Sequence, residues 1–225
     1  MFSSLFGSSA KTRMVTPDDA LPGHAERPFT VPATHAVLGT PLEGPFPEGM
    51  SLLYVGLGCF WGAEKRFWRI PGIHTTAVGY QGGITPNPTY DEVCTGRTGH
   101  AENVVVVYDP LVVPTYDVLK VFWENHDPTQ GFRQGNDIGT QYRSALYWTT
   151  DEQAELVERT RASYDALLRQ KGYGEVTTEL APAEGLPFYY AEAVHQQYLA
   201  SSKNPNGYDC HAETGIQLPP LDAIA

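Results

Sequence analysis

Hydrophobic residues along the chain fall into short continuous runs and into sets with helical spacing, which predicts strands alternating with helices. The continuous runs predict strands at 52–57, 75–80, 104–108, 144–148 and 175–180. Apolar residues three or four positions apart predict helices at 59–70, 114–125, 151–171 and 191–199. The connections between these elements differ in length. The pattern therefore favours an α+β fold, a two-layer sandwich, over a regular doubly wound sheet.

Polar, proline- and glycine-rich segments at both ends divide the chain into three predicted parts. Residues 1–50 show little periodicity, which is typical of an extended arm. Residues 51–202 hold the regular elements and are expected to form the α/β sandwich domain. Residues 203–225 are expected to form a coil-rich tail, and Cys210 lies in it.

The acidic composition narrows the classes of partner. The net charge is −11 and the pI is about 5.0, so the chain repels phosphate backbones and a nucleic-acid partner is not expected. No run approaches the length of apolar sequence that spans a membrane. The first residues lack a basic stretch followed by a long apolar one, so we expect no secretory signal and a cytoplasmic protein. We expect a monomer.

The three cysteines do not form the pattern of a disulfide framework or of a zinc site. They are Cys59, Cys94 and Cys210, an odd number with no C-x-x-C pair and no histidines at ligand spacing. We therefore expect no metal. The simplest interpretation of each thiol is a small buried hydrophobic group, and each must be judged from its own surroundings.

Cys59 lies where the first predicted strand meets the first predicted helix. A thiol in the first turn of a helix feels the positive end of the helix dipole, which favours the thiolate. Flanking glycines allow close backbone approach, and the neighbouring Phe60 and Trp61 would suit a small, uncharged substrate. The segment fits a structural interpretation equally well, with Phe60 and Trp61 as core residues beneath a buried cysteine.

Five segments, in order, resemble the peptide methionine sulfoxide reductase A family. The first, Gly58-Cys59-Phe60-Trp61-Gly62, resembles the family's catalytic signature. The others are GGITPNPTY at 82–90, GHAE at 99–102, NDIGTQYRS at 136–144 and HQQYL at 195–199. One short match would be weak evidence, but five ordered matches between about residues 50 and 215 are specific.

The resemblance implies a reductase that acts on the S epimer of methionine sulfoxide, free or in proteins, with Cys59 as nucleophile. It implies no metal and no bound organic cofactor. It also implies recycling by thioredoxin or a similar dithiol donor, and a ferredoxin-like core within the sandwich. In such an enzyme Phe60 and Trp61 would contact the substrate.

The chemistry of sulfoxide reduction assigns a role to Glu102. A sulfoxide oxygen is a poor leaving group, so thiolate attack on the sulfur requires that this oxygen be protonated or strongly hydrogen-bonded. Glu102, just before the valine-rich strand, is the natural acid if burial raises its pKa. Taken alone, Glu102 would be interpreted as a solvated carboxylate at a strand end.

Two tyrosines and one aspartate complete the predicted catalytic set. Tyr90 and Tyr142 have phenolic donors that could hold the sulfoxide oxygen, although each could equally pack with its hydroxyl at the surface. By resemblance, Asp137 orients water or the substrate main chain. A turn-forming role for Asp137 is equally consistent with the sequence.

Attack by Cys59 leaves a sulfenic acid that a second thiol must resolve. Cys210 is the candidate because its glycine- and asparagine-rich tail could reach Cys59, and loop-closure entropy grows only slowly with length. Many family members carry two cysteines in this tail, whereas this chain has Cys210 alone, so we expect the reductant to attack a Cys59–Cys210 disulfide directly. Cys94 is interpreted as a buried thiol without a redox role.

Two other classes of protein stay open at this point. The first is another thiol enzyme, such as a peroxidase or an acyl transferase, the latter needing a histidine base beside the cysteine. The second is a non-enzymatic redox sensor or peptide-binding module that uses Trp61 and the tyrosine loops as an apolar cradle. A steady-state assay with a dithiol separates both from a reductase.

Overall fold

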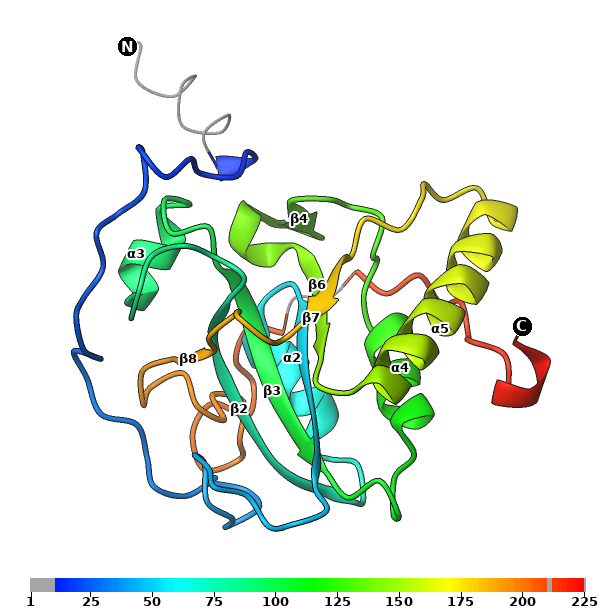
Figure 1. The fold of residues 1–225 in the computed structure, drawn as a ribbon, viewed down its shortest axis with the longest axis horizontal. Coiled ribbons are helices and arrows are strands. Elements are labelled where there is room, and N and C mark those ends of the chain that lie inside the picture. Colours follow the sequence, from blue (N-terminus) through cyan, green and yellow to red (C-terminus); the bar gives the residue numbers. More distant parts are fainter. Residues whose placement is uncertain (1–10, 210–211, 225) are drawn as a thin grey trace.

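The computed structural model describes residues 11–209 and 212–224. The main strands are β1 (Ser51–Leu57), β2 (Ile73–Gln81), β3 (Ala101–Tyr108), β6 (Ser144–Trp148), β7 (Glu179–Pro182) and β8 (Tyr189–Tyr190). Within the described residues these six form one sheet in the order β7–β6–β1–β3–β2–β8 (Figure 1). Its neighbours are antiparallel except β6 and β7, which are parallel. The protein thus has a mixed α+β fold built around a central sheet.

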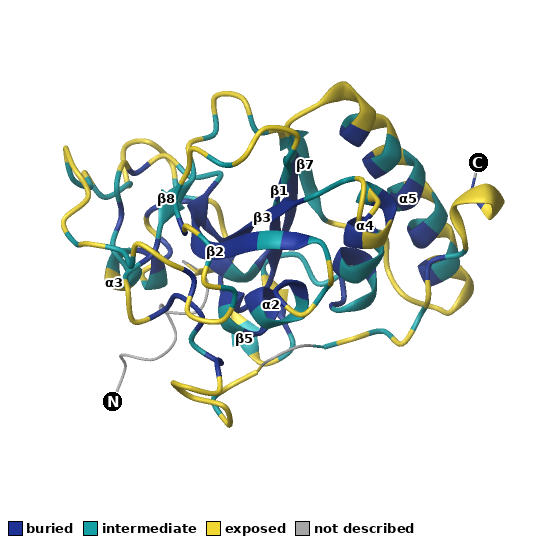
Figure 2. Cartoon of the chain, turned by 90° about the horizontal axis from the view of Figure 1, so that it is seen from below, coloured by how far each residue is buried: buried dark blue, intermediate teal, exposed yellow. Residues whose placement is uncertain are grey.

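Strand β3 runs through the middle of the sheet and is buried along its whole length. Val104 and Val106 face the core shared with the helices, whereas Val105 and Val107 face a second hydrophobic cluster on the opposite side. A strand covered on both faces must be apolar at successive positions, which explains the continuous valine run. Figure 2 shows that the central strands are almost entirely buried, while the connecting segments are largely intermediate or exposed.

Helices cover one face of this sheet. They are α2 (Phe60–Phe67), α4 (Thr115–Glu124) and α5 (Asp151–Gln170), with the short α3 (Tyr90–Cys94) in the loop after β2. Phe60, Phe67, Phe122 and Trp123 fill the core between the helices and the strands, and α4 lies beside α5 (Figure 1). The amphipathic spacing seen in the sequence buries these side chains.

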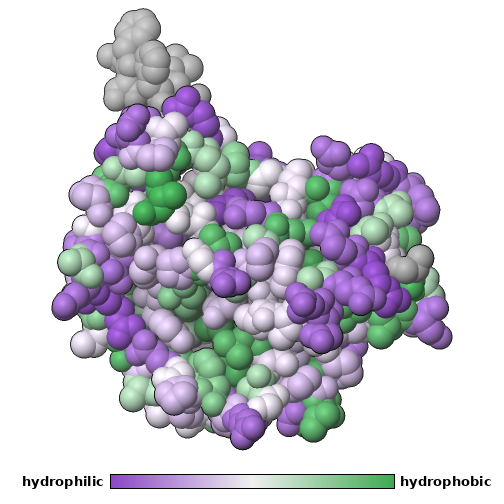
Figure 3. Space-filling view, in the orientation of Figure 1, coloured by the Kyte–Doolittle hydropathy of each residue, from purple (hydrophilic) through white to green (hydrophobic). Residues whose placement is uncertain are grey.

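The opposite face of the sheet is covered by residues that precede β1. Leu42 is fully buried there, and Val31 and Phe46 pack around it against the outward-facing valines of β3. The surface of this side is mainly polar or weakly hydrophobic, with its most hydrophobic side chains in separate patches (Figure 3). Residues 11–50 contain little regular structure, but part of this segment belongs to the packed body of the protein.

The residues after position 211 also pack on the body. Leu218 and Ile224 are buried in the main core, and Tyr164 donates to or accepts from Thr214 through its hydroxyl. Tyr116 donates a hydrogen bond to the Pro219 carbonyl. The chain therefore ends along the outer side of the helices, as the red segment of Figure 1 shows.

Most predicted elements are present, often with the local signals that predicted them. Strands lie at four of the five predicted places with ends that differ by a few residues, and α5 begins with the expected capping box between Thr150 and Gln153. Gly172 follows α5 with φ +85°, as a helix-ending glycine should. The fifth strand is displaced: β7 spans Glu179–Pro182 and not 175–180.

The predicted helix at 191–199 is wrong. The chain forms a series of turns there, and Gln197 has φ +46°, which no α-helix accommodates. The Gln196 side chain instead bonds to the Val78 backbone N–H and carbonyl on β2. Gln197 bonds to Glu64 on α2 through both its backbone and its side chain. Contacts with distant elements have overridden the helical spacing.

None of the helices in the described part of the chain has the length and apolar character needed to span a membrane.

The packing of the first segment leads to a stability prediction. Leu42→Ala should lower the free energy of unfolding by roughly 2–5 kcal/mol, because it leaves a cavity against the second sheet face. Urea denaturation followed by circular dichroism measures the change. Leu111→Ala is the matched control, since Leu111 is 94% exposed. Equal stability of the two variants would contradict the inferred packing of Leu42 against the sheet.

Candidate active site

Cys59 lies at the N-terminal end of α2, one residue before the helix begins. It is the N-cap residue, so the expectation that it lies in the first turn is corrected by one position. The preceding Gly58 has φ +95°, and a Cβ at that position would lie 2.6 Å from the Cβ and Cγ of Gln134. Only glycine fits both the backbone conformation and this close approach. The turn holds Cys59 with 5% of its surface exposed.

Glu102 lies directly beside this turn. One carboxyl oxygen accepts a hydrogen bond from the backbone N–H of Phe60 at 3.1 Å, and the side chain is fully buried. Within the described part of the chain the other oxygen, Oε1, is buried and has no hydrogen-bond partner. Burial, aided by the charge of Asp137, raises the pKa of Glu102 to about 8. The carboxyl is therefore predominantly protonated at neutral pH, and Oε1 can act as a donor toward the site.

The Cys59 thiol is also held in its protonated form. Burial, and after it the negative charge of Glu102, raises the pKa of Cys59 well above its usual value. The backbone N–H groups of Trp61 and Gly62 act in the opposite direction, as expected at a helix N-terminus. The expected stabilisation of a thiolate is thus present, but the cost of burying a charge outweighs it.

Aromatic rings form a wall beside Cys59. Phe60 and Trp61 lie on α2, and Tyr90 stacks near both with ring centroids 6.3 and 6.5 Å away. His195 lies 4.3 Å from Tyr90, and Tyr198 stacks on Trp61 at 4.0 Å. His195 and Tyr198 were not among the predicted site residues, although both lie in the HQQYL segment that resembles the family.

The phenols of Tyr90 and Tyr142 are near the same carboxyl. Tyr90 begins α3 and Tyr142 ends the short 3₁₀ helix η1 (Thr140–Tyr142). Burial, followed by the charge of Glu102, raises the pKa of both phenols, and Cys59 adds to the effect at Tyr142. Both hydroxyls thus keep their protons and can donate hydrogen bonds. The structure brings both predicted tyrosines together with Cys59 and Glu102.

Asp137 lies in β5 (Asp137–Ile138), which pairs with β4 (Arg133–Gln134). Its Oδ1 accepts a hydrogen bond from the Tyr208 hydroxyl at 3.1 Å. Its Oδ2 is buried and has no hydrogen-bond partner among residues 11–209 and 212–224. The charge of Asp137 contributes to the raised pKa values of Glu102 and Cys59, so this carboxylate lies near both groups.

Cys94 differs from its predicted setting. It is partly buried, not buried, and ends α3. Burial and the charge of Glu102 raise its pKa, and a hydrogen bond from the Tyr90 hydroxyl lowers it. Cys94 is therefore close to the candidate catalytic groups, which its position in a polar loop did not indicate.

Cys210 lies outside the described residues, but residues on both sides of it are described. Asp209 pairs with Lys65 of α2 at 3.3 Å, and Glu213 pairs with Arg66 of α2 at 2.8 Å. The Ala212 N–H donates to Gln134, the residue that packs against Gly58. The described parts of the tail thus lie along α2, with Asp209 and Glu213 paired to its last turn and Ala212 bonded to Gln134 beside Gly58.

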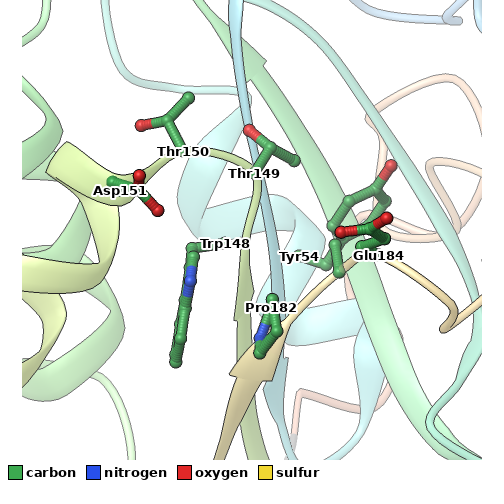
Figure 4. Close-up of a pocket in the computed structure, with 8 residues that line it drawn as sticks. Tyr54, Trp148, Thr149, Thr150, Asp151, Pro182 and Glu184 are labelled. Atoms are coloured by element: carbon green, nitrogen blue, oxygen red, sulfur yellow. The ribbon is translucent and has the colours of Figure 1, made fainter.

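A separate hollow lies between the end of β6, the start of α5 and the segment after β7. Its lining includes Tyr54, Trp148, Asp151, Pro182 and Glu184 (Figure 4). None of the candidate catalytic residues lines it. The chemistry of the site described above therefore belongs to the α2 end of the sheet, not to this hollow.

A buried cysteine at a helix terminus, a protonated carboxyl beside it and phenolic donors around both define a thiol enzyme. Comparisons with known proteins then specify the family. The family model described as peptide methionine sulfoxide reductase matches residues 51–221. A peptide methionine sulfoxide reductase MsrA of Salinispora tropica is 56% identical, with 96% of each chain covered. One from Azotobacter vinelandii is 60% identical, covering 91% of this chain and 92% of its own.

Solved structures agree. Methionine sulfoxide reductase A of Corynebacterium diphtheriae has a TM-score of 0.78 and 47% identity, covering 92% of this chain and 99% of its own. Mxr1 from Saccharomyces cerevisiae in reduced form has a TM-score of 0.63 and 34% identity, covering 75% and 94%. The chain belongs to the peptide methionine sulfoxide reductase family and is an oxidoreductase. The family predicted from the five sequence segments is confirmed, and the rival classes of protein are set aside.

Proposed function

We propose that the protein reduces the S epimer of methionine sulfoxide, free or in proteins, and that Cys59 is the nucleophile. The observation that carries this proposal is the buried Oε1 of Glu102, which has no hydrogen-bond partner in the described chain. It belongs to a carboxyl with a pKa of about 8 that is anchored to the residue next to Cys59. A general acid for a sulfoxide oxygen requires these properties. The preference for the S epimer rests on the family resemblance.

The protons and electrons of the proposed reduction step all come from Cys59, Glu102 and the substrate. Glu102 donates its proton to the sulfoxide oxygen while the Cys59 sulfur attacks the sulfoxide sulfur, and the thiol proton returns to the carboxylate. The attack forms a bond between the two sulfurs. The hydroxyl then passes to the Cys59 sulfur as this sulfur–sulfur bond and the sulfur–oxygen bond of the substrate both break. The substrate sulfur gains two electrons and Cys59 loses two, which yields methionine and a sulfenic acid.

The neighbouring residues have supporting roles in this proposal. Tyr90 and Tyr142 hold the sulfoxide oxygen by hydrogen bonds, since their raised pKa values keep both phenols protonated. Trp61, which is only partly buried, receives the apolar part of the substrate, and the fully buried Phe60 packs beside it. Asp137 offers a buried acceptor toward water or the substrate main chain.

We further propose that Cys210 resolves the sulfenic acid. Its thiol attacks the Cys59 sulfur, forms a disulfide and releases water, and thioredoxin or a similar dithiol then supplies two electrons to restore both thiols. The contacts of its described flanks support this role. Asp209 and Glu213 pair with the last turn of α2, and the Ala212 N–H donates to Gln134, which packs against Gly58 beside Cys59.

We also propose that the sheet and its helices contain a ferredoxin-like core. The order of elements β1–α2–β2–β3–α4–β6 with spatial order β6–β1–β3–β2 supports a ferredoxin-like core. Division into an arm (1–50), a catalytic domain (51–202) and a tail (203–225) is kept, with parts of the arm and tail packed on the domain. A monomeric, cytoplasmic protein is proposed as well.

The direct test is a single-turnover reaction of the reduced protein with resolved epimers of N-acetylmethionine sulfoxide. We expect one methionine derivative per protein from the S epimer and none from the R epimer. Folded Cys59→Ser, checked by circular dichroism, should form none from either. Equal rates on both epimers would contradict the stereochemical assignment, and normal turnover by Cys59→Ser would exclude Cys59 as nucleophile.

Glu102→Gln should slow the reduction step by roughly 10²–10⁴-fold, the usual contribution of a general acid. The pH dependence gives a second signature. Above pH 8 Glu102 loses its proton, so it cannot donate, and its charge raises the pKa of Cys59 further. The single-turnover rate of the wild type should therefore fall as the pH rises through about 8. Glu102→Gln should lack this fall, and an unchanged rate in this variant would remove Glu102 from the mechanism.

Cys210→Ser should leave the first turnover unchanged, because Cys210 takes no part in the attack on the sulfoxide. Turnover with thioredoxin should then fall sharply, since this donor needs a disulfide to attack, whereas dithiothreitol should restore part of it by reducing the sulfenic acid. Peptide mapping by mass spectrometry after one wild-type turnover should give a Cys59–Cys210 disulfide. A Cys59–Cys94 disulfide, or full thioredoxin-dependent activity in Cys210→Ser, would contradict the proposal.

A further inference from the structure

The turns at 191–199 pack against β2 and α2, two elements that lie beside the candidate site. In Figure 1 this segment, drawn in orange, follows β8 and curls beside β2. Ala191 and Gln196 bond to Val78 of β2, and Gln197 bonds to Glu64 of α2, so the segment is fixed at several points. It carries Glu192, which no sequence signal singled out.

The carboxylate of Glu192 joins α3 to the sheet. Its Oε1 accepts a hydrogen bond from the backbone N–H of Tyr90 at 2.7 Å. Its Oε2 accepts a hydrogen bond from the hydroxyl of Tyr80, also at 2.7 Å. Tyr80 is a fully buried residue of β2 whose ring lies 5.9 Å from that of Phe60. Both oxygens of one carboxylate are thus used to fix Tyr90 relative to the core beside Cys59.

The same turn also orients Trp61. The indole N–H of Trp61 donates to Nδ1 of His195 at 3.2 Å, and an indole nitrogen can only donate. A neutral His195 must therefore carry its proton on Nε2, the atom that lies 4.0 Å from Glu192. The backbone N–H of His195 donates to the Glu192 carbonyl, which fixes the distance between the two residues along the turn.

We propose that Glu192 is a positioning residue for sulfoxide reduction, which acts by fixing the Tyr90 phenol at the substrate oxygen. This inference rests on the proposed function of the site. The Tyr90 backbone lies at the first residue of a five-residue helix, an element too short to be rigid by itself. An interaction at the backbone N–H of Tyr90 therefore controls where its hydroxyl lies, and small displacements of a donor reduce catalysis strongly.

The hydrogen-bond pattern predicts which substitution preserves this role. Glu192→Ala removes both acceptors. Glu192→Gln keeps an acceptor oxygen for the Tyr90 N–H, and its amide can donate to the Tyr80 hydroxyl oxygen, which accepts as well as donates. A purely electrostatic contribution of Glu192 would be lost equally in both variants, whereas a positional one is retained by glutamine.

The experiment is a double-mutant cycle in the full-length reduced protein, with single-turnover reduction of the S epimer of N-acetylmethionine sulfoxide as the readout. Glu192→Ala should lower the ratio of rate constant to half-saturation concentration by roughly 10- to 100-fold. Glu192→Gln should stay within a few-fold of wild type. In a Tyr90→Phe background Glu192→Ala should cause little further loss, because both changes remove the same phenolic hydrogen bond. Glu184→Ala, in an exposed glutamate of the hollow in Figure 4, is the matched control.

Three outcomes would overturn the proposal: wild-type kinetics in folded Glu192→Ala, equal losses in the alanine and glutamine variants, or losses that simply add to that of Tyr90→Phe. Thermal unfolding of each variant separates a general loss of stability from the kinetic effect. If Glu192→Ala does not fold, Glu192→Gln still tests the proposal. Failure of the proposed function itself is distinguishable, because the wild-type protein would then reduce neither epimer.

Discussion

The hydrogen bond from the Phe60 backbone to Glu102 is the interaction on which the candidate site depends. It joins the first turn of α2 to the central strand β3 and so sets the distance between thiol and carboxyl. Because it leaves Oε1 of Glu102 buried without a partner in the described chain, an ionised carboxylate would be costly there. Burial raises the pKa values of both Glu102 and Cys59, and the Phe60 N–H offsets only part of this rise at Glu102.

A second buried carboxyl, that of Glu64, fixes the middle of α2. Glu64 is fully buried and accepts hydrogen bonds from Thr76 on β2 and from Gln197. Gln197 in turn accepts one from the Ala36 N–H in the first segment of the chain. Helix α2 is thus tied to the sheet, to the segment before β1 and to the turns after β8. This network accounts for the turns at 191–199: Gln197 bonds to Glu64 through its backbone and its side chain in a conformation with φ +46°, which is not helical.

The sequence predicted those features that local physical chemistry decides. The valine run of β3, the capping box at Thr150 and the position of Cys59 next to a glycine all depend on near neighbours. Helix α3 was not predicted, although Thr89 and Glu92 form a capping box at its start. Its five residues lie in a polar, glycine-rich stretch that was interpreted as a loop. Glu192 and the turns around it could not be predicted, because their partners are distant in sequence.

The first segment of the chain packs on the sheet and also holds the loop that carries Tyr90. Leu21 and His24 bond to the backbone of the loop that carries Tyr90, at Arg97 and Pro86. His24 also contacts Glu92, the residue that caps α3. Tyr90 is therefore held from two sides, by the arm through its loop and by Glu192 through its backbone N–H. A phenol on a short helix can serve as a fixed donor only when its surroundings supply the rigidity that the helix lacks. Two segments that are distant in sequence supply that rigidity here.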